Sequence, residues 1–62
     1  MGTAGYRQVM AYRLKHGDVI LDPEGNEATV IRIQRVDHLR GRLTTDRGVA
    51  IVPLDQAFPV RQ

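Results

Sequence analysis

Apolar residues recur at every second position along most of the chain, and this alternation limits the fold more than any other feature. Ile31 and Ile33 alternate with Arg32 and Gln34, for example, which is the period of a strand with two different faces. No window of about eleven residues keeps the i, i+3, i+4, i+7 spacing of an amphipathic helix. The sequence therefore predicts an all-β domain.

Turn residues divide the chain into short strands. Asp22–Asn26 contains a proline and a glycine and is typical of a tight turn, and Asp46–Gly48 is typical of a second hairpin turn. Pro53 ends a strand because it has no backbone N–H for the ladder. Leu54–Ala57 is long enough for one turn of 3-10 helix. The expected strand segments are Val9–Leu14, Val19–Leu21, Glu27–Val36, Leu39–Thr45, Val49–Val52 and Phe58–Val60, with a helical turn as the alternative for the first of them.

The longest of these segments needs a change of register. Ile31 and Ile33 share one phase of the alternation, whereas Val30 and Val36 share the opposite phase with Arg32. A β-bulge within the segment would reconcile the two phases and would bend the strand, as a small barrel requires. We expect the isoleucines to face inward. The predicted core is Leu14, Val19, Leu21, Ile31, Ile33, Leu43, Val52, Leu54 and Phe58.

The length of 62 residues leaves room for one domain. We expect a flexible N-terminal segment over residues 1–8 and a single domain over residues 9–62. The first residues lack the basic and apolar regions of a signal peptide, and no apolar run approaches the roughly 20 residues needed to span a bilayer. The chain also lacks cysteine, which fits a reducing compartment. A cytoplasmic protein without membrane contact is the resulting prediction.

The order of these elements resembles the SH3-like small barrels, a superfold that includes KOW, Tudor and Sm-like modules. The segments that carry the resemblance are Leu14–Ile20, with its Leu-x-x-Gly-Asp-Val-Ile pattern, Ala28–Val36 and Ile51–Phe58. The resemblance implies a five-stranded barrel with one 3-10 turn before the last strand. It leaves the function open, because this superfold supports many functions. A Tudor cage or a peptide-binding SH3 groove needs several clustered aromatic residues, and this chain has only Tyr6, Tyr12 and Phe58.

The sequence indicates a protein that is not an enzyme. It contains neither serine nor cysteine, so the usual side-chain nucleophiles are missing. His16 and His38 each lie near an aspartate, but both fall in predicted turns, and their spacing matches no metal-ligand pattern. We therefore expect no metal, no cofactor and no small-molecule substrate.

Arginine residues form the strongest candidate for a binding site. Eight of the nine basic residues are arginine, and the formal net charge is +2. If the third and fourth segments pair as antiparallel neighbours, the period of two places their polar residues on one outer face. Arginine binds phosphate groups well. We expect a DNA or RNA site made of Arg32, Gln34, His38, Arg40 and Arg42, and an ordinary solvated face is the alternative.

A protein-association module is the rival interpretation. Val30 and Val36 fall in the outer phase, together with Val49 and Ile51 of the following hairpin. Such an apolar patch is larger than a small core can absorb, so it would be covered by a second copy or by another protein. In this interpretation Val30 and Val36 are interface residues, and the chain is a component of a phage, plasmid or multi-subunit assembly.

Overall fold

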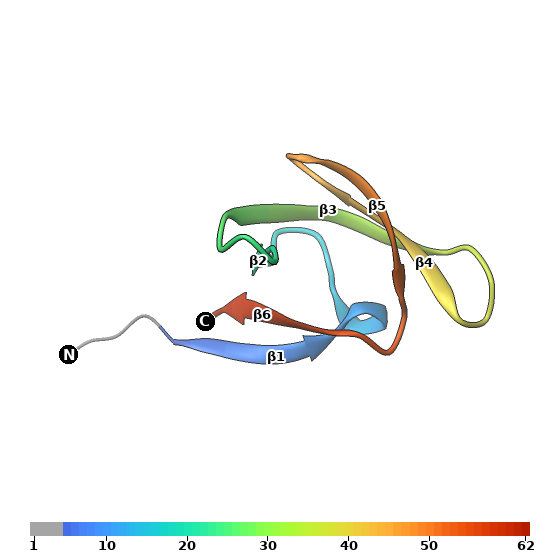
Figure 1. Ribbon diagram of the computed structural model, residues 1–62, viewed down its shortest axis with the longest axis horizontal. Helices are drawn as coiled ribbons and strands as arrows, with labels where there is room; N and C mark the ends of the chain where they lie inside the picture. The colour runs from blue at the N-terminus through green and yellow to red at the C-terminus, as the bar shows by residue number, and fades with distance from the viewer. Residues whose placement is uncertain (1–4) are drawn as a thin grey trace.

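The computed structural model describes residues 5–62, and this part of the chain folds as one antiparallel β-sheet (Figure 1). The spatial order of its six strands is β1-β6-β2-β3-β4-β5. This arrangement confirms the all-β class. The strands are β1 (Tyr6–Met10), β2 (Val19–Leu21), β3 (Glu27–Arg35), β4 (Arg40–Thr45), β5 (Gly48–Pro53) and β6 (Ala57–Arg61).

The structure has six strands, whereas the resemblance to the SH3-like barrels implied five. Each strand overlaps one of the six segments expected from the alternation, and the first of them begins at Tyr6 and not at Val9. Residues 6–8, which were assigned to an N-terminal segment outside the domain, belong to β1 and pair with β6. Residues 1–4 of that segment lie outside the described residues. Among residues 5–62, β5 pairs only with β4 and β1 pairs only with β6, so the described sheet has two edges and does not close into a barrel.

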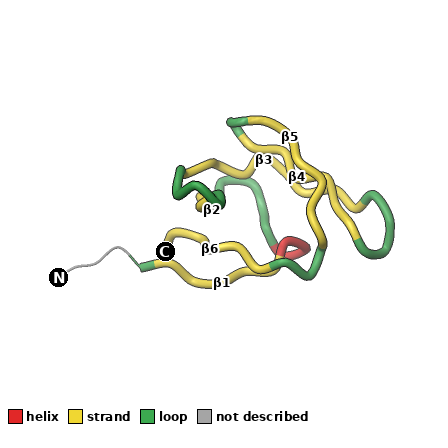
Figure 2. The backbone as a smooth tube through the Cα atoms, viewed as in Figure 1, coloured by secondary structure: helices red, strands yellow, loops and turns green. Residues whose placement is uncertain are grey.

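A helical turn replaces the second half of the expected first strand. The 3-10 turn η1 (Ala11–Arg13) follows β1 directly and appears in red in Figure 2. The Leu14 N–H donates to the Ala11 carbonyl at 3.1 Å, and the Ala11 N–H donates to the Gln56 carbonyl at 2.8 Å. The prediction of a 3-10 turn before the last strand is wrong. There the chain makes a simple turn, in which the Gln56 N–H donates to the Pro53 carbonyl at 3.2 Å.

The expected bulge in β3 is confirmed, and it decides which residues face inward. Val30 pairs with Thr45 and Arg32 pairs with Thr44, so Ile31 is the extra residue. Val30 is 0% exposed and Ile31 is 44% exposed. The prediction that Ile31 is a core residue is therefore wrong, and so is the prediction that Val30 lies on the outer face. The alternation placed the bulge within the strand correctly but reversed its effect on these two neighbours.

The core lies between the β1-β6-β2 side of the sheet and the inner phase of β3 and β4. Its predicted members Leu14, Leu43 and Phe58 are buried in one cluster, and Leu54 is also buried. Val19, Leu21, Ile33 and Val52 are partly buried. The remaining members of the cluster were not predicted as core residues; they are Ala11, Ile20, Ala28, Val30 and Val60.

The β2–β3 hairpin forms where the tight turn was expected. The Asp22 carboxylate accepts hydrogen bonds from the N–H groups of Glu24 at 2.9 Å and Asn26 at 2.8 Å. Gly25 has a φ of +86°, which glycine adopts without steric cost. This turn fixes the register in which Ile20 pairs with Ala28, and both side chains enter the core.

Candidate functional site

The bulge and the β3–β4 register bring the predicted polar residues onto one outer face. Gln34 pairs directly with Arg42, and Arg32 pairs with Thr44. Leu43, which lies between the two β4 residues, is buried on the opposite face. Residues opposite each other on antiparallel strands project to the same side of a sheet. We call Arg32, Gln34 and Arg42 the arginine face, and all three residues are exposed.

Neither arginine of the arginine face forms an ion pair with a carboxylate of residues 5–62. Among residues 5–62, the ion pairs are Lys15–Asp18, Arg40–Asp37 and Arg61–Glu27. Arg32 and Arg42 are in none of them. Their side chains lie on adjacent strands, so the positive potential of the two guanidinium groups adds on one surface. An anion is the ligand that such a surface attracts.

Arg40 has the same phase as Arg42 but is held by Asp37. Its Nη2 lies 2.9 Å from Asp37 Oδ2, and its Nε donates to the same oxygen at 3.2 Å. The Leu39 N–H bond to the Asp37 carboxylate, together with the Arg40 side chain, lowers the pKa of that carboxyl from its ordinary value. The Arg40–Asp37 pair thus organises the β3–β4 loop, and Arg40 contributes little net charge to the face.

His38 lies in the loop between β3 and β4 and belongs to a different depression. It lines a volume of about 290 Å³ together with Tyr12, Arg35 and Leu39, and with Leu54 and Asp55. Arg35 pairs with Gly41 and so has the phase opposite to Arg32 and Gln34. The structure therefore brings together Arg32, Gln34 and Arg42, and it separates His38 from them.

Exposed apolar residues lie beside the arginine face. Ile51 pairs with Arg42, and Val49 pairs with Thr44, so both apolar side chains share the outer face with the arginines. They are 51% and 63% exposed, respectively. Val36 is also exposed, just after β3, whereas Val30 belongs to the core of its own chain. The apolar patch is therefore formed mainly by β5, with Ile31 as a further exposed residue.

A second basic group was missed by the sequence analysis. Arg7, Arg13 and Lys15 line a depression of about 260 Å³ that also contains Asp18. The Lys15 Nζ lies 3.6 Å from the Asp18 carboxylate, which also accepts the Lys15 N–H at 3.0 Å. Arg7 was missed because residues 1–8 were placed outside the domain. The three basic residues come from β1, η1 and the following loop, so no sequence spacing indicated that they would meet.

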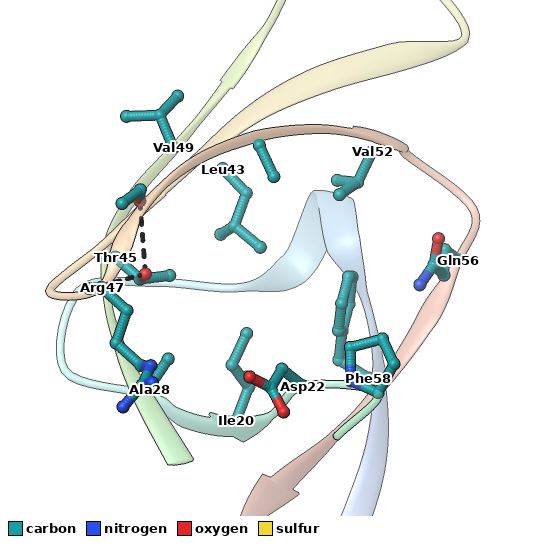
Figure 3. Close-up of a pocket in the computed structure, with 13 residues that line it drawn as sticks. Ile20, Asp22, Ala28, Leu43, Thr45, Arg47, Val49, Val52, Gln56 and Phe58 are labelled. Carbon is teal, nitrogen blue, oxygen red and sulfur yellow. Dashed lines mark hydrogen bonds between the residues drawn. The ribbon is translucent and has the colours of Figure 1, made fainter. Parts of the chain in front are cut away.

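An apolar pocket of about 370 Å³ lies under β5 (Figure 3). Ile20, Leu43, Val52 and Phe58 line it, and Asp22, Arg47 and Gln56 supply polar groups. We call this volume the β5 pocket. Residues of β2, β4 and β6 form the wall that faces β5. Because a five-stranded barrel was expected, this pocket was not predicted from the sequence.

The remaining chemistry of the described chain is limited. Within residues 5–62, no three His, Asp or Glu side chains gather so that they could hold a metal ion. The same residues contain no helix of the length and apolar character needed to cross a membrane. Thr45 is used locally, because its Oγ1 donates to the Gly48 carbonyl at 3.3 Å and accepts the Arg47 N–H at 3.1 Å.

No protein-family model, curated protein or solved structure matches the chain.

Proposed function

We propose that this chain is a small, non-catalytic, SH3-like module that binds nucleic acid through the arginine face. The observation that carries the proposal is the outward projection of Arg32 and Arg42 on adjacent strands, without a carboxylate partner among residues 5–62. The SH3-like assignment is supported by the consecutive strands β2–β6 and by the bulge that bends β3. The lack of cysteine supports a cytoplasmic setting.

Phosphate contacts would supply most of the affinity. Guanidinium groups donate paired hydrogen bonds to phosphate oxygens, and Gln34 adds one amide that can reach a base edge or a sugar. No aromatic side chain lies on this face. Tyr6 donates a hydrogen bond to Glu27 and Phe58 is buried, and the exposed Tyr12 belongs to η1 and lines the depression that contains His38. Binding to single strands depends on aromatic stacking. We therefore expect duplex nucleic acid to bind at least as well as single strands, with little sequence preference.

Fluorescence polarisation with labelled DNA and RNA tests the proposal. With two or three phosphate contacts, log K should fall with log salt at a slope of about −2 to −3 for duplex DNA. The double variant Arg32→Ala/Arg42→Ala should remove most of this slope. Arg7→Ala/Arg13→Ala removes the same charge from the other basic group and is the matched control, for which we expect a smaller loss.

Two results would contradict the proposal. The first is the absence of binding to both DNA and RNA at low salt. The second is an equal or larger loss in the Arg7→Ala/Arg13→Ala variant, which would mean that net charge or the other basic group accounts for the binding. Circular dichroism of both double variants shows whether the fold persists, and all four substituted residues are exposed.

Protein association is the second candidate function, and the exposure of β5 favours it. Val49 and Ile51 are more than half exposed, and the β5 pocket lies on the other face of the same strand. A patch of this kind is typical of a surface that is covered in an assembly. In this role the chain would be a component of a phage, plasmid or multi-subunit complex, or would associate with itself.

A further inference from the structure

The edge strand β5 carries no charged side chain. Its sequence is Gly-Val-Ala-Ile-Val-Pro, and every residue except Val52 is exposed. Natural sheets discourage pairing at an edge with charges, bulges or prolines within the strand. Here the charged residues Arg47 and Asp55 lie outside the strand, and Pro53 stands at its end. β5 is therefore an edge that is suited to pairing.

The hydrogen-bond pattern shows which backbone groups of β5 are open. The Leu54 N–H donates to the Leu39 carbonyl at 2.9 Å, and hydrogen-bonded pairs alternate along an antiparallel ladder. Ala50 therefore exchanges hydrogen bonds with Leu43, whereas the backbone groups of Val49 and Ile51 point away from β4. Neither residue has another backbone partner among residues 5–62.

We propose that two copies of this chain pair through their β5 strands, antiparallel and centred on Ala50. The inference rests on the second candidate function, protein association, and names the partner. It is independent of nucleic-acid binding. In this arrangement Val49 of one copy exchanges both hydrogen bonds with Ile51 of the second copy, and the reverse pair is identical by symmetry.

This register is the one that satisfies every open group. Centring the pair on Ile51 would place Val49 opposite Pro53 of the second copy, which has no N–H to donate and whose carbonyl accepts the Gln56 N–H. Centring it on Val49 would place Ile51 opposite Arg47 of the second copy, whose N–H is bonded to Thr45 Oγ1. The Ala50-centred register leaves no donor or acceptor of Val49 or Ile51 unpaired.

Side chains fit the same register. On the outer face, the exposed Val49 packs against Ile51 of the second copy, as β-branched pairs do across strands. On the inner face, Val52 of the second copy lies beside Gly48, where a side chain would meet no atom within 4 Å, and it extends the wall of the β5 pocket. Antiparallel pairing also brings Arg47 to the same end as Asp55 of the second copy, whereas parallel pairing would bring like charges together.

The pair would form a continuous sheet. The two-fold axis of an antiparallel strand pair is perpendicular to the sheet, so both arginine faces project to the same side. A seam of two strands is smaller than a standard protein interface. The association is therefore weak and depends on protein concentration.

Matched charge substitutions test both the pairing and its register. Val49→Glu/Ile51→Glu places glutamates opposite each other in the pair, whereas Val49→Lys/Ile51→Glu places each new lysine opposite a new glutamate. Both variants put the same residue at position 51, beside Arg42 on β4, so the fold experiences the same change there. In sedimentation at low salt, the mass of the wild type should rise with protein concentration from 7.0 kDa toward twice that value.

We expect the wild type and Val49→Lys/Ile51→Glu to form pairs. Val49→Glu/Ile51→Glu should remain a monomer. Amide exchange at Val49 and Ile51 should slow as the wild-type concentration rises. Exchange at Ala50, already paired with β4, is the internal reference.

Four results would overturn the inference: a wild-type monomer at millimolar concentration, pairing by the Val49→Glu/Ile51→Glu variant, no pairing by the Val49→Lys/Ile51→Glu variant, or species larger than two copies. Sedimentation reports only self-pairing, and polarisation reports nucleic-acid binding, so the two can fail separately. A monomer would leave protein association to a different partner.

Discussion

The two edge strands of the sheet differ in how well they are protected against pairing with a further strand. β1 carries Arg7, which pairs with the core residue Val60 and therefore lies on the inner face of the sheet. An inward-pointing charge on an edge strand discourages pairing with a further strand. Tyr6, in the same strand, donates to the Glu27 carboxylate at 3.0 Å. β5 has no comparable protection. We call β1, β6 and β2 the β1 side, and β4, β5 and the end of β3 the β5 side. On the β1 side, Arg61 and Tyr6 are bound to the Glu27 carboxylate. On the β5 side, Arg32 and Arg42 are exposed and form no ion pair among residues 5–62.

The largest change in the free energy of unfolding is expected for substitutions at the β3 bulge, where the two sides meet. Val30→Ala removes buried methyl groups from the core and should lower the free energy of unfolding by roughly 2–4 kcal/mol, much of the total for a domain of this size. Ile31→Ala, at the exposed neighbour, should cost less than about 1 kcal/mol. Urea denaturation measures both, and a larger loss for Ile31→Ala would contradict the register of β3.

Glycine substitutions compare the packing of the two sides. A Cβ on Gly41, in β4, would lie 2.7 Å from Leu54 Cδ2 and 3.1 Å from the Gln34 carbonyl oxygen. Gly41→Ala should therefore cost about 1–2 kcal/mol through overpacking. Gly5→Ala, next to β1, meets nothing closer than a Gln62 side-chain oxygen at 3.4 Å, and its effect should stay within about 0.5 kcal/mol. Equal urea midpoints for the two variants would show that Leu54 is not packed against Gly41.

Charge removal should separate the two sides in stability. Arg61 Nη2 lies 2.5 Å from a Glu27 oxygen, and this carboxylate raises the pKa of Arg61. Glu27→Gln should lower the thermal midpoint slightly, because it weakens this pair and the Tyr6 bond. Arg42→Gln removes a charge that has no ion-pair partner among residues 5–62, so the midpoint should stay the same or rise. A larger drop in the thermal midpoint for Arg42→Gln than for Glu27→Gln would contradict this prediction. It would mean that Arg42 stabilises the fold more than the Glu27 interactions do.

The smallest expected effect is on the stability of the protein at low pH. The pKa of Asp37 is lowered in the folded protein, first by the Leu39 N–H and then by Arg40. The unfolded chain therefore binds a proton more readily, so the contribution of this carboxylate is present above the ordinary pKa of 3.8 and is lost as the pH falls through the folded-state value. Asp37→Asn should lower the urea midpoint at neutral pH and should flatten its decline below pH 3.8. An unchanged decline would mean that other carboxylates cause it.

The alternation of residues allowed the strands of the β5 side to be predicted well. Arg32, Gln34 and Arg42 reach one face because the period of two holds along β4 and after the bulge. The bulge itself was predicted, but period alone does not state which neighbour it turns outward. Burying Val30 instead of Ile31 depends on packing against Thr45 and the core, which is tertiary information.

The β1 side was predicted less well for a different reason. Tyr6–Met10 contains Arg7 and Gln8 between its apolar residues, and its strand conformation depends on pairing with β6 at the other end of the chain. Such long-range pairing leaves little trace in local sequence. The basic group around Arg13 and the β5 pocket were missed for the same reason, since both depend on where β1 and β5 lie in the sheet.

The most direct test of the central claim is a backbone NMR titration with a short DNA duplex at low salt. We expect the largest chemical-shift changes on the β5 side, at Arg32, Gln34 and Arg42, and only small changes at the amides of Arg7 and Arg13. The largest changes around Arg7, Arg13 and Lys15, or no changes at all, would contradict this claim.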